Sequence, residues 1–68
     1  MLAERIKQLR KERRYYQREL AEYLGVSVRT YQFYESGQNE PSIKSLVALA
    51  DFYGVTTDYL VGRTDERS

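Results

Sequence analysis

Apolar residues recur along the chain at the three-to-four-residue spacing of amphipathic helices, and no segment shows the alternation of a surface strand. Leu2, Ile6 and Leu9, for example, share one face of a helix over residues 2–13. The same spacing predicts further short helices over residues 17–24, 28–36, 43–53 and 57–61. The sequence therefore predicts an all-α fold, a compact bundle of five short helices.

Capping residues mark the ends of these segments. Serine or threonine precedes three of them, where the side-chain oxygen can accept a hydrogen bond from the first turn: Ser27, Ser42 and Thr56. Glycine follows four of them, because glycine tolerates the left-handed conformation that ends a helix: Gly25, Gly37, Gly54 and Gly62. Gln38–Pro41 is predicted to be a loop, since proline disfavours helix at the residue before it.

Two further expectations concern burial. The fourth helix should bury one apolar stripe, made of Ile43, Leu46, Leu49, Ala50 and Tyr53. Beyond the last helix, the polar tail Arg63–Ser68 is expected to fray.

Length and composition limit the classes of function. A chain of 68 residues forms a single domain, residues 1–68, and it contains no Cys and no His. That removes disulfides, the usual zinc ligands and catalysis by Cys or His. We expect no metal, no cofactor and no enzymatic activity. No apolar run is long enough to span a membrane and none resembles a signal peptide, so we expect a cytoplasmic protein.

Charge is divided unevenly along the chain, although the net charge is only +1. Residues 1–34 hold eight basic and four acidic groups, whereas residues 35–68 hold three basic and six acidic groups. The two halves therefore carry +4 and −3. Such asymmetry favours one face that meets a polyanion. The alternative is a basic first helix that is simply solvated.

Residues 17–34 meet the requirements of a helix-turn-helix. Ala21 is small enough for the second helix to cross the first closely, and Gly25 suits the tight turn between them. Apolar residues fall where the two helices face each other and the core: Leu20, Leu24, Val26, Tyr31 and Tyr34. In this motif the second helix enters the major groove of duplex DNA. The stretch therefore predicts a DNA-binding unit.

The chain also resembles the Cro/repressor-type, or Xre-like, helix-turn-helix family over residues 3–63. The matching segments are Ile6–Arg10, Gln17–Ser27, Tyr34–Gly37, Pro41–Ser42, Leu49–Ala50, Gly54–Thr56 and Asp58–Leu60. The resemblance implies a lambda-repressor-like fold and sequence-specific binding of double-stranded DNA by a transcriptional regulator of the repressor type. It also implies a homodimer that reads two half-sites about 34 Å apart. Its dimer surface is expected near Tyr53, Val55 and Tyr59.

The resemblance assigns roles outside the second motif helix as well. Gln17 is implied to bind a phosphate at the start of its helix, where free N–H groups favour an anion. Arg18, the next residue, is the second candidate phosphate contact. Arg10 and Glu35 are implied to form an ion pair between the first and third helices. We interpret this pair as holding the fold rather than contacting DNA, because breaking a partly buried pair is costly.

The segment 28–34 is expected to read the groove. Periodicity turns Tyr31 and Tyr34 inward. Four other side chains face outward or lie at the flank: Val28, Arg29, Gln32 and Phe33. Arg29 can bridge O6 and N7 of guanine, Gln32 can pair with N6 and N7 of adenine, and the two apolar residues can contact thymine methyl groups. The alternative is that Arg29 and Gln32 are ordinary surface residues and that Phe33 covers part of the core.

Three positions depart from the family pattern, and one of them is Thr57, which replaces a usually apolar residue of the last helix. Tyr16 stands where the family usually has a Thr or Ser N-cap, so this helix start lacks one hydrogen bond. Glu19 can still reach back to the backbone there. Tyr31 stands at a normally aliphatic position, and its buried hydroxyl needs a partner that the sequence does not identify.

Two other classes of function compete with DNA binding. A protein-interaction module, such as an antitoxin or adaptor, would bind its partner through Phe33 or the region of Tyr53, whatever the DNA sequence. An enzyme would have to use Glu19 and Glu22, but carboxylates at helical spacing are usually solvated. DNA binding is therefore the favoured interpretation.

Overall fold

Five helices and no strand make up the chain in the computed structural model, which describes residues Met1–Ser68. They are α1 (Leu2–Glu12), α2 (Gln17–Leu24), α3 (Val28–Ser36), α4 (Ile43–Tyr53) and α5 (Thr57–Val61). The all-α fold predicted from the apolar spacing is confirmed, and each boundary lies within one residue of its predicted position. None of the helices is long and apolar enough to cross a membrane.

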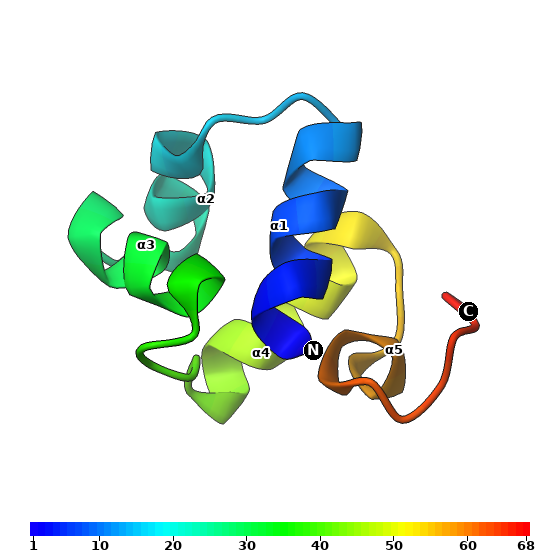
Figure 1. Cartoon of the computed structure of the whole chain (residues 1–68). Helices are drawn as coiled ribbons and strands as arrows, with labels where there is room; N and C mark the ends of the chain where they lie inside the picture. Colours follow the sequence, from blue (N-terminus) through cyan, green and yellow to red (C-terminus); the bar gives the residue numbers. More distant parts are fainter.

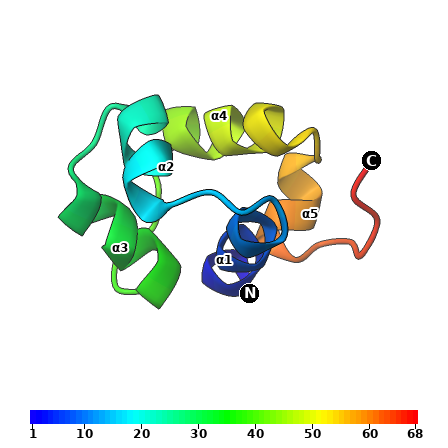
Figure 2. The same ribbon diagram turned by 90° about the horizontal axis from the view of Figure 1, so that it is seen from above.

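The helices surround a single core. α1 runs through the middle of the domain, with α2 and α3 on one side and α5 and the C-terminus on the other (Figure 1). Seen from above, α4 extends across the molecule from α2 to α5 (Figure 2). Eleven buried apolar residues form the core: Ile6, Leu9, Leu20, Ala21, Tyr31, Tyr34, Leu49, Ala50, Tyr53, Tyr59 and Leu60. In both views α3 lies at one edge of the domain, so its outer face is left uncovered by other helices.

The predicted N-caps of the last three helices are present. Each side-chain oxygen accepts a hydrogen bond at 3.0–3.1 Å from the backbone N–H three residues further on: Ser27 from Thr30, Ser42 from Ser45, and Thr56 from Tyr59. These bonds satisfy N–H groups that a helix leaves without an internal partner. The starts of α3, α4 and α5 are therefore fixed by local sequence.

The start of α2 is capped from one side only. The Tyr16 N–H donates to Oε1 of Glu19 at 2.8 Å, but the Tyr16 side chain makes no capping hydrogen bond. Tyr16 is 64% exposed, and the guanidinium of Arg18 lies over its ring with Cζ 5.0 Å from the ring centroid. The ring therefore adds little to the core, and one cap of α2 is missing.

Replacing Tyr16 with Ser should raise the free energy of unfolding by about 1 kcal/mol, because serine supplies the missing cap oxygen. Urea denaturation followed by circular dichroism measures this change. Tyr16→Phe is the matched control, since it keeps the ring and provides no acceptor, and its midpoint should equal that of the parent. A lower midpoint for Tyr16→Ser would mean that packing of the ring outweighs the cap.

The first residue of α4 departs from the predicted stripe. Ile43 is 81% exposed, whereas Leu49, Ala50 and Tyr53 are buried and Leu46 packs against the core in part. Side chains of a helix tilt toward its N-terminus, so a residue in the first position points past the end of the helix. The prediction that Ile43 is buried was therefore wrong.

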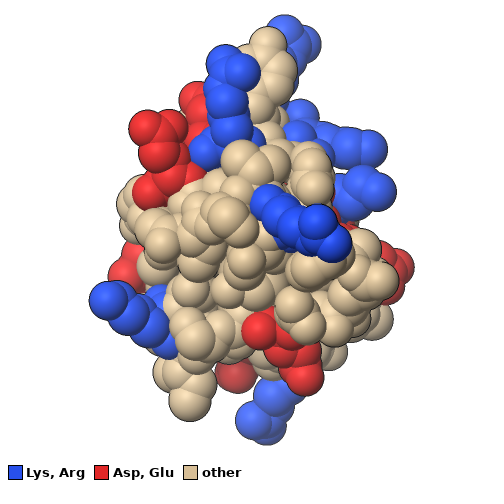
Figure 3. Space-filling model, turned by 90° about the vertical axis from the view of Figure 1, so that its left-hand side faces the viewer, with Lys and Arg blue, Asp and Glu red and all other residues tan.

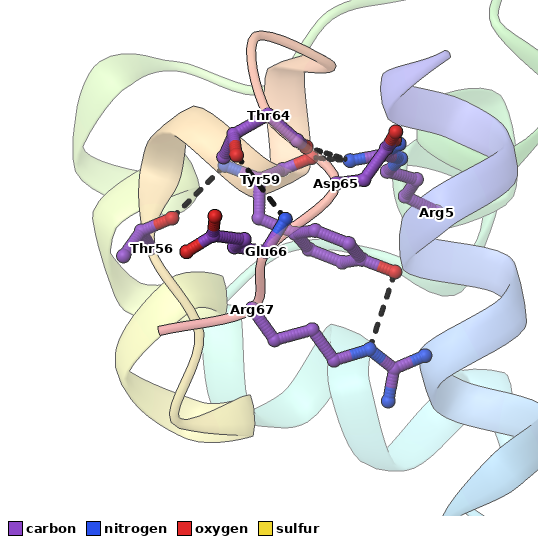
Figure 4. A network of polar contacts seen from close by, with 7 residues as sticks. All are labelled: Arg5, Thr56, Tyr59, Thr64, Asp65, Glu66 and Arg67. Carbon is purple, nitrogen blue, oxygen red and sulfur yellow. Dashed lines mark hydrogen bonds and ion pairs between the residues drawn. The ribbon is translucent and has the colours of Figure 1, made fainter.

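The C-terminal tail Arg63–Ser68 folds back onto α1 and α5 (Figure 4). The prediction that this tail frays was therefore wrong. Arg5 of α1 donates to the carbonyl oxygens of Tyr59 and Thr64 at 2.6 and 2.5 Å and to Asp65 at 2.6 Å. Its guanidinium also lies over the Tyr59 ring, 4.2 Å from the centroid. Arg5, which the sequence analysis did not assign, thus anchors the first part of the tail.

A second arginine anchors the end of the tail. Arg67 makes two hydrogen bonds of 2.8 Å to the carboxylate of Glu12, and its Nε donates to the Tyr59 hydroxyl at 3.3 Å. Its carbonyl oxygen accepts from the Thr56 N–H at 3.0 Å. The contact with Glu12 was not foreseen, because Glu12 lies 55 positions away from Arg67 in the chain.

Candidate nucleic-acid interface

α2, the turn after it and α3 form the helix-turn-helix predicted from residues 17–34. Gly25 adopts the left-handed conformation with φ +72°, and the N–H of Val26 donates to the Ala21 carbonyl at 3.0 Å. Ala21 is buried between the helices. Only a residue that tolerates positive φ fits the turn without strain, so Gly25 sets the angle at which α3 crosses α2.

The outward face of α3 carries the four predicted base-reading residues. Tyr31 and Tyr34 are buried, while Val28, Arg29 and Gln32 are exposed. Phe33 is half-buried, yet it is absent from the apolar residues that pack against the core: Leu2, Tyr15, Leu24, Val26, Leu46, Phe52 and Val55. The interpretation of Phe33 as a cover for the core is therefore not supported.

Gln17 at the start of α2 makes two hydrogen bonds. Its Nε2 donates to Oε1 of Glu35 at 3.2 Å, and its Oε1 accepts from Nε2 of Gln32 at 3.2 Å. The candidate phosphate ligand and a candidate base reader therefore touch each other. This pair could not be predicted from the sequence, because only the crossing of α2 and α3 brings the two amides together.

Arg10 and Glu35 form the ion pair that the family resemblance implies. Nε of Arg10 donates to Oε2 at 2.7 Å and the adjacent guanidinium nitrogen donates to Oε1 at 3.1 Å. The Glu35 side chain is only 3% exposed and that of Arg10 is 13% exposed. Arg10 also donates to the Tyr15 carbonyl at 2.9 Å. This geometry turns the pair away from solvent and links α1 to the end of α3.

The environment of Glu35 favours its charged form. Burial alone would raise the pKa of this carboxyl, but the contacts from Arg10, Tyr31 and Gln17 outweigh burial and lower the pKa. Glu35 is thus the polar group next to the buried hydroxyl of Tyr31, although this hydroxyl makes no hydrogen bond of normal geometry. Burial, followed by the charge of Glu35, raises the pKa of Tyr31, so the phenol stays neutral.

Basic side chains surround one end of this surface. Figure 3 shows the side of the molecule that carries α3, and most of its Lys and Arg side chains lie in the upper half. The upper end holds the C-terminal part of α1 and the turn to α2, a segment rich in Arg and Lys (Figure 1). Arg18, the second candidate phosphate contact, is exposed. An anion approaching α3 therefore meets positive charge beside it.

The three residues that mark the expected dimer region expose little surface of their own. Tyr53 and Tyr59 are only 2% and 6% exposed, and their rings belong to the core. Val55 is half-buried and packs against the same core. The resemblance implied a dimer surface in this region, but the rings of Tyr53 and Tyr59 fill the interior of the domain. No group of three or more acidic residues lies close enough to hold a metal ion.

Comparison with known proteins identifies the family of the chain. The helix-turn-helix family model matches residues 6–60. The prophage-derived HTH-type transcriptional regulator YonR of Bacillus subtilis is 39% identical over 64 residues, which cover 94% of this chain and 59% of that protein. The phage CTXphi transcriptional repressor RstR of Vibrio cholerae is 38% identical over 65 residues, which cover 96% of this chain and 59% of that protein.

A solved structure gives the same result. The crystal structure of a transcriptional regulator from Listeria innocua superposes with a TM-score of 0.90 at 36% identity, over 97% of this chain and 62% of that one. The chain thus spans about three fifths of the length of the relatives it matches. By sequence and by fold, the chain belongs to the Xre-like helix-turn-helix family.

Proposed function

We propose that the chain is a sequence-specific binding domain for double-stranded DNA, which inserts α3 into the major groove and regulates transcription as a repressor. The hydrogen bond between Gln17 and Gln32 carries this proposal. It joins a helix N-terminus suited to a phosphate with the outward face of α3, so that one surface can hold the backbone and read a base.

The candidate base contacts follow from the groups exposed on α3. Arg29 offers two parallel donors that match O6 and N7 of guanine. Gln32 uses one N–H on Gln17, which leaves a second N–H and its oxygen for N7 and N6 of adenine. Val28 and Phe33 supply apolar surface for thymine methyl groups. These residues give α3 contacts to more than one kind of base pair.

Gln17 and Arg18 are the proposed phosphate contacts. Gln17 retains one free side-chain N–H after bonding Glu35, and the first backbone N–H groups of α2 have no partner within the helix. Arg18 adds a full positive charge beside them. The pair would fix the register of α3 on the duplex without reading its sequence.

We further propose that the domain works as a cytoplasmic homodimer on a palindromic site and has no enzymatic activity. Three or four base contacts from one helix give little affinity alone, and two domains on half-sites about 34 Å apart double them. The RstR relative is named a transcriptional repressor, which supports the same mode of action here.

Selection of bound duplexes from a random pool tests the proposal. A palindromic enriched site would support both sequence reading and dimer symmetry. Failure to enrich any duplex, together with binding of a protein partner that Phe33→Ala abolishes, would replace the proposal with a protein-interaction module of the antitoxin or adaptor kind.

Gln17→Ala should weaken binding to all duplexes by a similar factor, because it removes a phosphate contact. Selectivity should change only at the base pair that Gln32 reads, since that side chain loses its support. The slope of log Kd against log salt should stay the same, whereas Arg18→Ala should lower it by about one unit. Titrations of both variants at several salt concentrations measure these effects. A changed ranking at every position would mean that Gln17 itself reads bases.

A further inference from the structure

Arg29 and Phe33 form a stacked pair on the outward face of α3. The guanidinium of Arg29 lies over the ring of Phe33, with Cζ 5.5 Å from the ring centroid. The two residues are four apart and therefore neighbours on one side of the helix. A cation over an aromatic face is attracted by the ring, so the stack limits the orientations of the guanidinium.

The core does not account for Phe33. Its ring is half-buried but lies outside the apolar set that packs against the core. The aromatic contacts of the domain join other rings, such as Tyr31 with Tyr34 and Phe52 with Tyr53. An aromatic side chain on a proposed binding face, held by an arginine and not by the core, presents apolar surface to a ligand.

The spacing of the pair limits what it can read. Four residues of α-helix advance about 6 Å along the axis. Base pairs follow one another at about 3.4 Å, so the ring reaches a position one or two base pairs from the base that Arg29 contacts. Thymine is the natural base that offers an apolar group in the major groove, its C5 methyl, while guanine offers two acceptors to arginine.

We infer that Arg29 and Phe33 act as one reading unit, which recognises a guanine together with the C5 methyl of a thymine one or two base pairs away. Phe33 contacts the methyl group and at the same time holds the guanidinium in place for the guanine. This inference rests on the proposed function, because it specifies the sequence that the same surface reads.

Deoxyuridine substitution in a selected duplex tests the inference, since it removes the methyl group and leaves base pairing unchanged. Each thymine of the site is replaced in turn and binding is titrated. At one thymine per half-site, the substitution should lower the affinity for the duplex about fourfold, which corresponds to one buried methyl group. This thymine should lie within two base pairs of the guanine for which Arg29→Ala loses its preference. A cytosine placed there should bind more tightly once it is 5-methylated.

Variants assign the methyl contact to a side chain. Phe33→Ala should abolish the deoxyuridine penalty and also weaken the preference for guanine, whereas Phe33→Leu should keep part of the penalty and lose the guanidinium stack. Val28→Ala tests the other apolar residue of α3 that is proposed to contact a thymine methyl group, and the penalty at this thymine should persist in it. Val47→Ala is the matched control, because Val47 is an exposed apolar residue of α4 outside the proposed interface. Thermal unfolding shows whether each variant is folded.

The outcomes separate the inference from the proposed function. A selected site with no deoxyuridine penalty, or a penalty that Val28→Ala abolishes instead, overturns the reading unit while duplex binding stands. A penalty that disappears in Phe33→Ala with the guanine preference intact shows that the two residues act separately, which also overturns it. Absence of any enriched duplex overturns both.

Discussion

Glu35→Ala should lower the free energy of unfolding by about 3–5 kcal/mol, because it leaves the guanidinium of Arg10 partly buried without its counter-ion. Gln17 loses a partner in the same variant. A loss of this size is comparable to the whole stability that a domain of this length usually has. Circular dichroism in a urea titration should therefore show a protein that is largely unfolded before urea is added.

The ion pair also makes stability depend on pH. Since the pKa of Glu35 is lower in the folded chain than in the unfolded one, its stabilising contribution is complete above the unfolded pKa of about 4.3. That contribution is lost as the pH falls through the folded pKa. Glu35→Gln, which keeps the shape but not the charge, should therefore differ most from the parent near neutral pH and least in acid. A constant difference across this range would mean that charge is not what Glu35 contributes.

Arg29→Ala should cost about 1–3 kcal/mol in DNA binding per half-site and should remove the preference for one base pair. The side chain is exposed on α3 and has no acidic partner in the fold, so the variant should lose only the small contribution of its stack on Phe33 and unfold close to the parent's urea midpoint. Titration against the preferred site and its single-base variants measures both effects.

Arg63→Ala is the matched control for charge. Arg63 follows shortly after α5, a helix that lies on the side of the domain away from α3 (Figure 1). Both variants remove one positive charge, but only Arg29→Ala should change the ranking of sequences. If Arg29→Ala weakens binding to every duplex equally, Arg29 is a phosphate contact and its assignment as a base reader is wrong.

Local signals made most of the fold predictable. A serine or threonine cap is decided by residues three apart, and a glycine after a helix acts within a few positions, so Ser27, Ser42 and Gly25 could be recognised without knowing the fold. The orientation of α3 followed from periodicity, because Tyr31 and Tyr34 had to point into the core that the apolar residues of α2 also enter.

Contacts between distant segments were beyond such reasoning. Arg67 looks like a free tail residue until Glu12 is placed beside it, and Gln32 looks like surface until α2 crosses α3. Ile43 fits the apolar period of α4, but its place at the helix start decides its exposure. Periodicity describes one helix at a time, and these features depend on where helices stop and meet.

The anchored tail offers a place to attach a label or a surface to the domain. Arg67 holds the chain end against Glu12 at the end of α1, on the opposite side from α3 (Figure 1). A fluorophore or a biosensor chip attached through Ser68 would therefore leave the helix-turn-helix open to solution. The anchoring of Arg67 beside Ser68 would also limit how far a dye moves from the domain, which suits measurements of rotational anisotropy during titration with oligonucleotides.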